Sequence, residues 1–296
     1  MLPGKANVNK NLLILHLTVF IWGFTGILGT LISVSAVQMV WYRVLIASIT
    51  LFVYFKFSKT SLKVSKEQFL SFFFIGSIVA LHWILFFQAI KVSTVSVTLV
   101  CLSSITLFTA ILEPLIKKQR IQMADIVIGL IIISGICLIF KFESQYTLGI
   151  IFGLSAALTA SLFSTLNSTL VQKSNPVIIG FYEIAGAFFW ITLYRLADGT
   201  LLLERFSLGI SDWLYLLFLG TICTALAYVA AVSVMRTLSA FRVALVTNLE
   251  PVYGILLAFI FFGTKETMSP GFYLGATLIL SAVFLYPVYK KYKNKG

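Results

Sequence analysis

Acidic residues, cysteines and histidines are all scarce in this chain of 296 residues. It has 10 Asp and Glu, 3 Cys and 2 His, while 59% of its residues are hydrophobic and 11% are charged. Soluble domains have roughly 45–50% apolar and about 25% charged residues, so this apolar excess cannot be buried in a soluble core. The scarcity of charge therefore excludes an ordinary soluble protein and indicates a membrane protein.

The few reactive side chains form no recognisable catalytic or metal-binding pattern. Cys101, Cys137 and Cys223 lie in apolar runs without CxxC or Cys/His spacing, so neither a disulfide framework nor a metal site is predicted. The histidines, His16 and His82, lie in different apolar runs and have no carboxylate motif beside them. An enzyme would require a cluster of such catalytic groups. We predict no catalytic residues, no metal and no cofactor, and a membrane-embedded enzyme is the weaker alternative.

The apolar residues form ten runs of about 20 residues, the length that crosses a hydrocarbon core of about 30 Å. The predicted spans are residues 11–32, 37–57, 69–90, 94–116, 122–141, 148–171, 176–197, 212–235, 239–262 and 270–289. Only residues 56–68 and 198–211 make connections of any length, and the second suits a short helix at the membrane interface. The sequence therefore predicts an all-α integral membrane protein with ten transmembrane helices.

Basic residues outnumber acidic ones and give a net charge of +12. In a soluble chain this charge would suggest nucleic acid. Here the basic residues lie between the apolar runs, so the predicted partner is the lipid bilayer and no nucleic acid is expected. Sixteen of the 22 Lys and Arg fall on one side, five on the other, and Arg43 lies inside a span. This bias predicts an inner (plasma) membrane protein with both termini in the cytoplasm.

The two halves of the chain resemble each other at an offset of about 140 residues. The matched pairs are Tyr42 with Tyr182, Arg43 with Glu183, Gly76 with Gly220 and Thr106 with Glu250. A near-constant offset over four spans indicates a duplicated five-span unit, with residues 1–145 as one repeat and 146–296 as the other. Because five is odd, the second copy must enter the membrane from the opposite face. Two inverted five-helix repeats are the architecture of many secondary transporters.

Four motifs resemble a known family. FIWGFTG in the first span, WYR in the second, LFTAILEPL in the fourth and NLEPVYGILLAFIFFG in the ninth are similar to the EamA-type permeases of the drug/metabolite transporter superfamily. The resemblance covers nearly the whole chain. It implies a secondary transporter that exports a small metabolite, amino-acid-like or amphipathic, by alternating access at a midplane cavity. The first half has no proline that matches Pro251, so a helix break shared by both halves is not predicted.

Two related activities stay open. Nucleotide-sugar and sugar-phosphate antiporters resemble the same fold, but they would need several Lys or Arg in the cavity to bind phosphate, and only Arg43 is clearly inside a span. No GxxxxGK[ST] motif is present, so transport should run on a gradient, with proton coupling, exchange and facilitated flux as alternatives. The transporter could act as a monomer or a homodimer.

Polar side chains inside the spans are the candidates for binding. Glu250 directly precedes Pro251 and shares a helical face with Thr247 and Gly254, so it could bind substrate or a proton, or hold the helix break. A histidine such as His82 could titrate or donate to a ligand, or be bonded to a neighbouring span. With the resemblance, the predicted substrate-binding residues are Trp22, His82, Trp83, Asn167, Tyr228, Asn248 and Glu250.

Arg43 and Glu183 occupy equivalent positions near the two predicted mouths of the bundle. We predict that they act in gating or form a structural ion pair. Two roles are open for Arg43: it could bond carbonyls or a carboxylate within the bundle, or it could recognise a substrate carboxylate.

Overall fold

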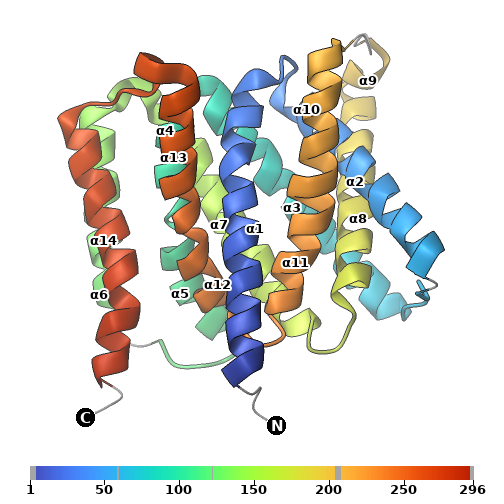
Figure 1. Cartoon of the computed structure of the whole chain (residues 1–296), viewed down its shortest axis with the longest axis horizontal. Coiled ribbons are helices and arrows are strands. Elements are labelled where there is room, and N and C mark those ends of the chain that lie inside the picture. The colour runs from blue at the N-terminus through green and yellow to red at the C-terminus, as the bar shows by residue number, and fades with distance from the viewer. Residues whose placement is uncertain (1–4, 59, 122, 204–207, 294–296) are drawn as a thin grey trace.

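The computed structural model describes residues 5–58, 60–121, 123–203 and 208–293, and this part of the chain is helical apart from its turns and loops (Figure 1). Seven spans are single helices: α1 (Lys5–Leu31), α2 (Ala36–Ser58), α3 (Lys66–Val92), α6 (Met123–Phe142), α7 (Thr147–Leu170), α8 (Pro176–Ala197) and α14 (Pro270–Lys293). Within the described ranges eight spans are long and apolar enough to cross a membrane, and α6 and α14 contain shorter apolar helices. The prediction of an all-α protein with ten spans is confirmed.

The other three spans are interrupted. They are α4 (Val95–Leu102) with α5 (Ile105–Ile116), α10 (Ile210–Gly220) with the π-helix η2 (Thr221–Leu226) and α11 (Ala227–Val234), and α12 (Ala240–Thr247) with α13 (Leu249–Phe262). Short elements lie outside the spans: η1 (Ser144–Tyr146), α9 (Thr200–Leu203) and η3 (Gly263–Glu266). The predicted interfacial helix corresponds in part to α9, and residues 204–207 lie outside the described residues. Before α9, the backbone N–H and hydroxyl of Thr200 bond Asp198 and lower the pKa of its carboxyl.

A helix break occurs at equivalent places in both halves, contrary to the expectation from the missing proline. The ninth span breaks at Asn248, and Pro251 lies in the first turn of α13, where a missing N–H costs no helical hydrogen bond. The fourth span breaks at Ser103 and Ser104 without a proline. There the backbone N–H of Ser104 donates to the Cys101 carbonyl three residues back, at 3.1 Å. The helix therefore tightens into a 3₁₀-type turn, and this N–H keeps a hydrogen-bond partner.

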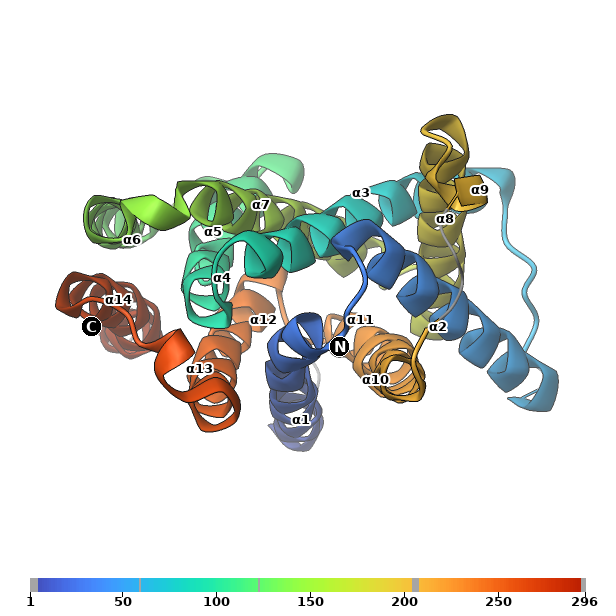
Figure 2. The ribbon, with the colours of Figure 1, turned by 90° about the horizontal axis from the view of Figure 1, so that it is seen from above.

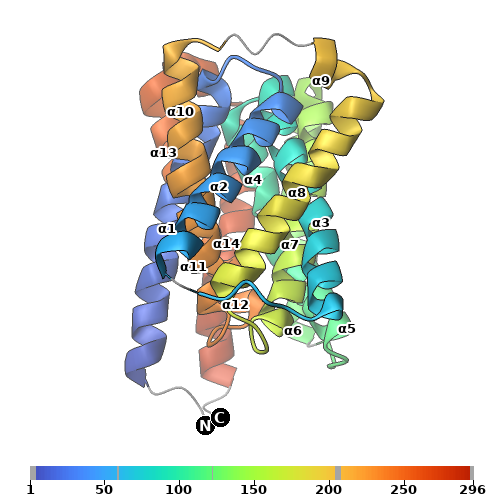
Figure 3. The same ribbon diagram turned by 90° about the vertical axis from the view of Figure 1, so that its right-hand side faces the viewer.

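The helices pack in equivalent pairs across the two halves. Helix α3 of the first half packs on α7 and α8 of the second half. In the same way, α10 and α11 of the second half pack on α2 and α1 of the first half. Likewise α4 and α5 pack on α7, while α13 packs on α1. The last spans of the halves, α6 and α14, lie together at one end of the bundle (Figure 2). The first turn of α1 and the last turn of α14 lie on the same side of the bundle (Figure 3), as ten spans require. This pairing is that of two inverted five-helix repeats.

Gly76 and Gly220 lie at equivalent places in the two repeats, each at a point where two helices cross closely. A Cβ on Gly76 of α3 would strike the backbone carbonyl of Glu183 on α8, and a Cβ on Gly220 of α10 would lie 3.1 Å from the carbonyl oxygen of Arg43 on α2. The sequence alignment pairs Gly76 with Gly220 and Arg43 with Glu183, so the same four positions meet in both crossings. Small residues at such crossings let helix backbones approach closely.

Gly76→Ala is therefore expected to destabilise the protein, by about 1–3 kcal/mol as for other overpacked sites. The added methyl group would meet backbone atoms of α8, including the Ala187 nitrogen at 2.8 Å, and backbone cannot move aside as a flexible side chain can. Gly209→Ala is the matched control, because a Cβ there has nothing within 4 Å. Thermal unfolding in detergent measures both variants. Equal melting temperatures for the two would contradict the close α3–α8 contact.

Candidate functional site

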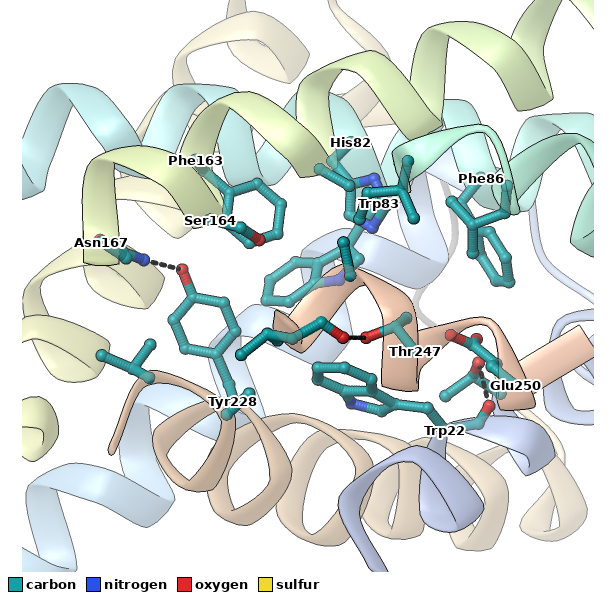
Figure 4. A pocket seen from close by; sticks show the side chains of 18 of the residues that line it. Trp22, His82, Trp83, Phe86, Phe163, Ser164, Asn167, Tyr228, Thr247 and Glu250 are labelled. Atoms are coloured by element: carbon teal, nitrogen blue, oxygen red, sulfur yellow. Dashed lines mark hydrogen bonds between the residues drawn. The ribbon is translucent and has the colours of Figure 1, made fainter. Parts of the chain in front are cut away.

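A cavity is lined by residues from both halves of the chain (Figure 4). Its wall is built by residues of α1, α2, α3 and the α4–α5 break from the first half, and of α7, η2, α11, α12 and α13 from the second. About 80 Å³ of the cavity is open to the centres of water-sized molecules. Since one water needs about 10–15 Å³ on this measure, the cavity has room for several waters or for the head of a small ligand.

Aromatic rings line much of this cavity: Trp22, Trp83, Phe86, Phe163 and Tyr228. The rings of Trp83 and Tyr228 meet edge to face with centroids 5.8 Å apart, and Phe163 lies 6.0 Å from Tyr228. Such a wall favours an apolar or aromatic ligand body.

Arg43 is the cationic group of the cavity wall. Its side chain is 2% exposed, and its Nε donates to the Thr224 hydroxyl at 2.6 Å. The guanidinium carbon lies 4.1 Å from the centre of the Trp83 ring, a cation–π contact. The bond from Nε thus links α2 to the π-helix η2. The other N–H groups of the guanidinium have no hydrogen-bond partner among the described residues.

Glu250 is the anionic group of the same wall. It is the second residue of α13, directly after the break at Asn248, and is 5% exposed. A carboxylate in the first turn of a helix is favoured by the helix dipole. Among the described residues Glu250 accepts no hydrogen bond and makes no ion pair with Arg43, although both line the cavity. Two opposite charges therefore face one small space without neutralising each other by contact.

His82 contributes a polar group from α3. Its Nδ1 lies 2.8 Å from the carbonyl oxygen of Ala156, and because a carbonyl can only accept, Nδ1 carries the hydrogen. The ring packs against Phe163, with centroids 5.4 Å apart. The bond to Ala156 fixes the ring in the wall, and the same imidazole lines the cavity.

Glu183 lies behind the wall rather than in it. It is 0% exposed, and its Oε2 accepts hydrogen bonds from Tyr228 Oη at 2.6 Å and Asn167 Nδ2 at 3.0 Å. Asn167 and Tyr228 themselves line the cavity. The expected ion pair between Glu183 and Arg43 is absent from the described residues, because Arg43 points toward Thr224 and Trp83 instead.

Six of the seven predicted substrate-binding residues line the cavity: Trp22, His82, Trp83, Asn167, Tyr228 and Glu250. The seventh, Asn248, does not. Its Nδ2 bonds the Thr106 hydroxyl at 2.5 Å and the Ala244 carbonyl at 2.8 Å, and so ties the two helix breaks together. No metal-binding group of three His, Cys, Asp or Glu occurs among the residues that the structure describes.

The π-helix η2 was not predicted from the sequence, although it positions two cavity residues. The Thr224 hydroxyl accepts from Arg43 and donates to the Leu219 carbonyl at 2.6 Å. Trp22 Nε1 donates to the Cys223 carbonyl at 3.2 Å. A π-turn changes the helical register by one residue and leaves hydropathy unchanged, so no pattern in TICTAL signals it.

Comparisons with known proteins agree with this architecture. The sequence model of the EamA-like transporter family matches residues 9–141 and again residues 147–286. An uncharacterized transporter of Archaeoglobus fulgidus is 23% identical over 167 residues, which make up 56% of this chain and little more than half, 58%, of that protein. A crystal structure of another protein shares the fold, with a TM-score of 0.70 and 15% identity over 95% of this chain and 98% of that one. Because the two matches of the family model together cover most of the chain, we conclude that the protein belongs to the EamA-like transporter family.

Proposed function

We propose that this chain is a secondary transporter that exports a small zwitterionic metabolite, amino-acid-like with an apolar body. The observation that carries this proposal is the placement of Arg43 and Glu250 in one aromatic-lined cavity without an ion pair between them. The guanidinium of Arg43 would bind the carboxylate of the substrate, and the carboxylate of Glu250 would bind the ammonium group of the substrate. The rings would enclose the side chain of the substrate.

Transport would follow alternating access between the halves, residues 1–145 and 146–296, around this cavity. Both halves contribute lining residues, so one chain holds a complete site and a monomer suffices. We place the protein in the plasma (inner) membrane with both termini in the cytoplasm, as the charge bias favours. The cavity suits phosphate poorly, because Arg43 is the one Lys or Arg among its described lining residues. We therefore rank a nucleotide-sugar or sugar-phosphate antiporter below the zwitterion transporter.

Three ligands that share the leucine side chain and differ in their charged groups test the proposal: L-leucine, N-acetyl-L-leucine without the ammonium, and L-leucinamide without the carboxylate. We expect leucine to bind at least about tenfold more tightly than either analogue, since a charge-assisted hydrogen bond contributes about 1.5–3 kcal/mol. Quenching of tryptophan fluorescence measures binding directly, because Trp22 and Trp83 line the cavity. Exchange of radiolabelled leucine in proteoliposomes measures transport.

Glu250→Gln should reduce the affinity for leucine to that of N-acetyl-L-leucine and leave the affinity for N-acetyl-L-leucine unchanged. Glu67→Gln is the control with the same chemistry, because Glu67 is exposed in the first turn of α3. Equal affinity for all three ligands, or a preference for either singly charged analogue, would exclude a zwitterion as the substrate.

A further inference from the structure

The carboxylate of Glu183 is surrounded by too few hydrogen-bond donors. Asn167 has two amide hydrogens, one directed to Glu183 Oε2 and one to Tyr228 Oη, and the Tyr228 hydroxyl hydrogen also goes to Oε2. All three donor hydrogens are thus used. Glu183 Oε1 and Asn167 Oδ1 are buried and have no hydrogen-bond partner among the described residues. Buried polar atoms are almost always satisfied, so this cluster has a place for at least one further proton.

No cation among the described residues balances this buried carboxylate. The titratable groups in the spans that surround α8 include Arg43, Tyr42 and Tyr54 of α2, His82 of α3 and Tyr228 of α11, while α7 and α9 have none. Arg43 is bonded to Thr224 and His82 to a backbone carbonyl, and neither forms an ion pair with Glu183. On α8 itself, Arg195 is 12 residues away, about 18 Å along the helix. The remaining charged groups of α2 and α3 lie toward the helix ends: Lys56, Lys66, Glu67 and Lys91.

An unpaired buried carboxylate costs several kcal/mol, and a bound proton removes that cost without needing space for an ion. We propose that Glu183 binds the coupling proton of this transporter and that Asn167 and Tyr228 link its protonation to the cavity. This inference rests on the transport function proposed above. Glu250 is less suited to the task, because the ammonium group of the substrate would occupy it in the cavity.

The proton path follows from the hydrogen bonds. A hydronium ion in the cavity gives one proton to Tyr228 Oη and becomes water. In the same step the Tyr228 O–H bond breaks, and that hydrogen moves to Glu183 Oε2, which lies 2.6 Å away. Oε2 then donates to Tyr228 Oη, and the new hydroxyl hydrogen of Tyr228 is free to turn toward the cavity. Protonation of Glu183 thereby adds one donor to the wall that contacts the substrate, and deprotonation removes it.

Glu183→Gln tests the proposal in proteoliposomes with L-leucine as the probe. Glutamine keeps the shape of the side chain and supplies the missing donor, but it cannot release a proton. The wild type should exchange leucine at equal pH. With a gradient of one pH unit it should accumulate leucine up to about tenfold at one proton per substrate. We expect the variant to retain exchange and to lose the gradient-driven accumulation.

Glu250→Gln should behave differently, with exchange and accumulation falling together because leucine binding is weakened. If E183Q still accumulates leucine on the gradient, or if the wild type exchanges leucine without responding to the gradient, Glu183 is not the coupling site while the transport function stands. If E183Q does not fold, Tyr228→Phe replaces it, since loss of the hydroxyl cuts the path, and the ratio of accumulation to exchange should fall.

A second measurement needs no substrate. Infrared difference spectra between high and low pH should show the signal of a buried protonated carboxyl group in the wild type, and this signal should be missing in E183Q. Identical spectra for the two proteins would overturn the proposal. Absence of leucine exchange by the wild type, with the carboxyl signal present, would refute the zwitterion substrate and leave the proton site in place.

Discussion

Replacement of Arg43 by lysine is expected to lower both the stability of the protein and its affinity for substrates with a carboxylate. Lysine keeps the charge but loses the Nε–H that bonds Thr224 and the planar group that stacks on Trp83. We expect a loss of about 1.5–3 kcal/mol in unfolding free energy, as for hydrogen bonds of charged groups. Affinity for leucine should fall at least about tenfold. Arg43→Ala should lose more of both, and thermal unfolding with fluorescence binding measures the two effects.

Thr224→Val separates the two roles of Arg43. It removes the acceptor of the Nε–H bond and leaves the guanidinium over Trp83. We expect this variant to lose stability as Arg43→Lys does while it keeps leucine affinity within about threefold, less than one charge-assisted bond contributes. Leucinamide has no carboxylate, so Arg43→Lys should leave its binding little changed. If T224V and R43K lose leucine affinity equally, the guanidinium has only a structural role.

Hydropathy and charge predict much of this fold because the bilayer imposes a length on each helix. The predicted spans at 176–197 and 37–57 fall within one residue of α8 and α2. The repeat offset also pairs positions that are equivalent in space: the backbone of Glu183 meets Gly76, and the backbone of Arg43 meets Gly220. These features depend on composition and periodicity along the chain.

The features that sequence reasoning missed depend on contacts between distant segments. The break at Ser103 and Ser104 needs no proline, because a tightened turn satisfies the backbone there. The partner of Arg43 is Thr224 rather than Glu183, although charge alone suggests the carboxylate. The position of Glu183 behind Tyr228 also follows from packing, since a residue's helical face does not say which neighbour covers it.

Two carboxylates join the fourth and ninth spans. Each carboxylate caps the first helix of the other span, and the two caps lie on opposite sides of the bundle. Glu266, in η3 after α13, accepts from the backbone N–H groups of Val95 and Ser96 at 3.1 and 2.9 Å, at the start of α4. Glu113, in α5, accepts from the backbone N–H of Phe241 at 2.8 Å, at the start of α12. Each broken span thus supplies the cap of the other, as an inverted repeat would arrange it.

Glu266→Ala is expected to destabilise the protein by about 3 kcal/mol or more, because it leaves two backbone N–H groups without an acceptor in a site that is nearly closed to water. It also removes the acceptor of the Ser96 hydroxyl, which lies 2.7 Å from Oε2. Glu113→Ala should cost less, about 1–2 kcal/mol, since one N–H is affected and the partly exposed Lys117 can turn to water. Thermal unfolding in detergent measures both effects.

Glu67→Ala is the matched control for these two variants, because Glu67 is exposed and should change stability by no more than about 0.5 kcal/mol. Glu266→Gln refines the test. An amide keeps one acceptor oxygen but loses the charge that the N-terminus of α4 favours, so its loss should lie between those of the wild type and Glu266→Ala. If Glu266→Ala melts at the same temperature as Glu67→Ala, the cap does not hold α4. The reciprocal arrangement would then stabilise only the end at which Glu113 meets α12.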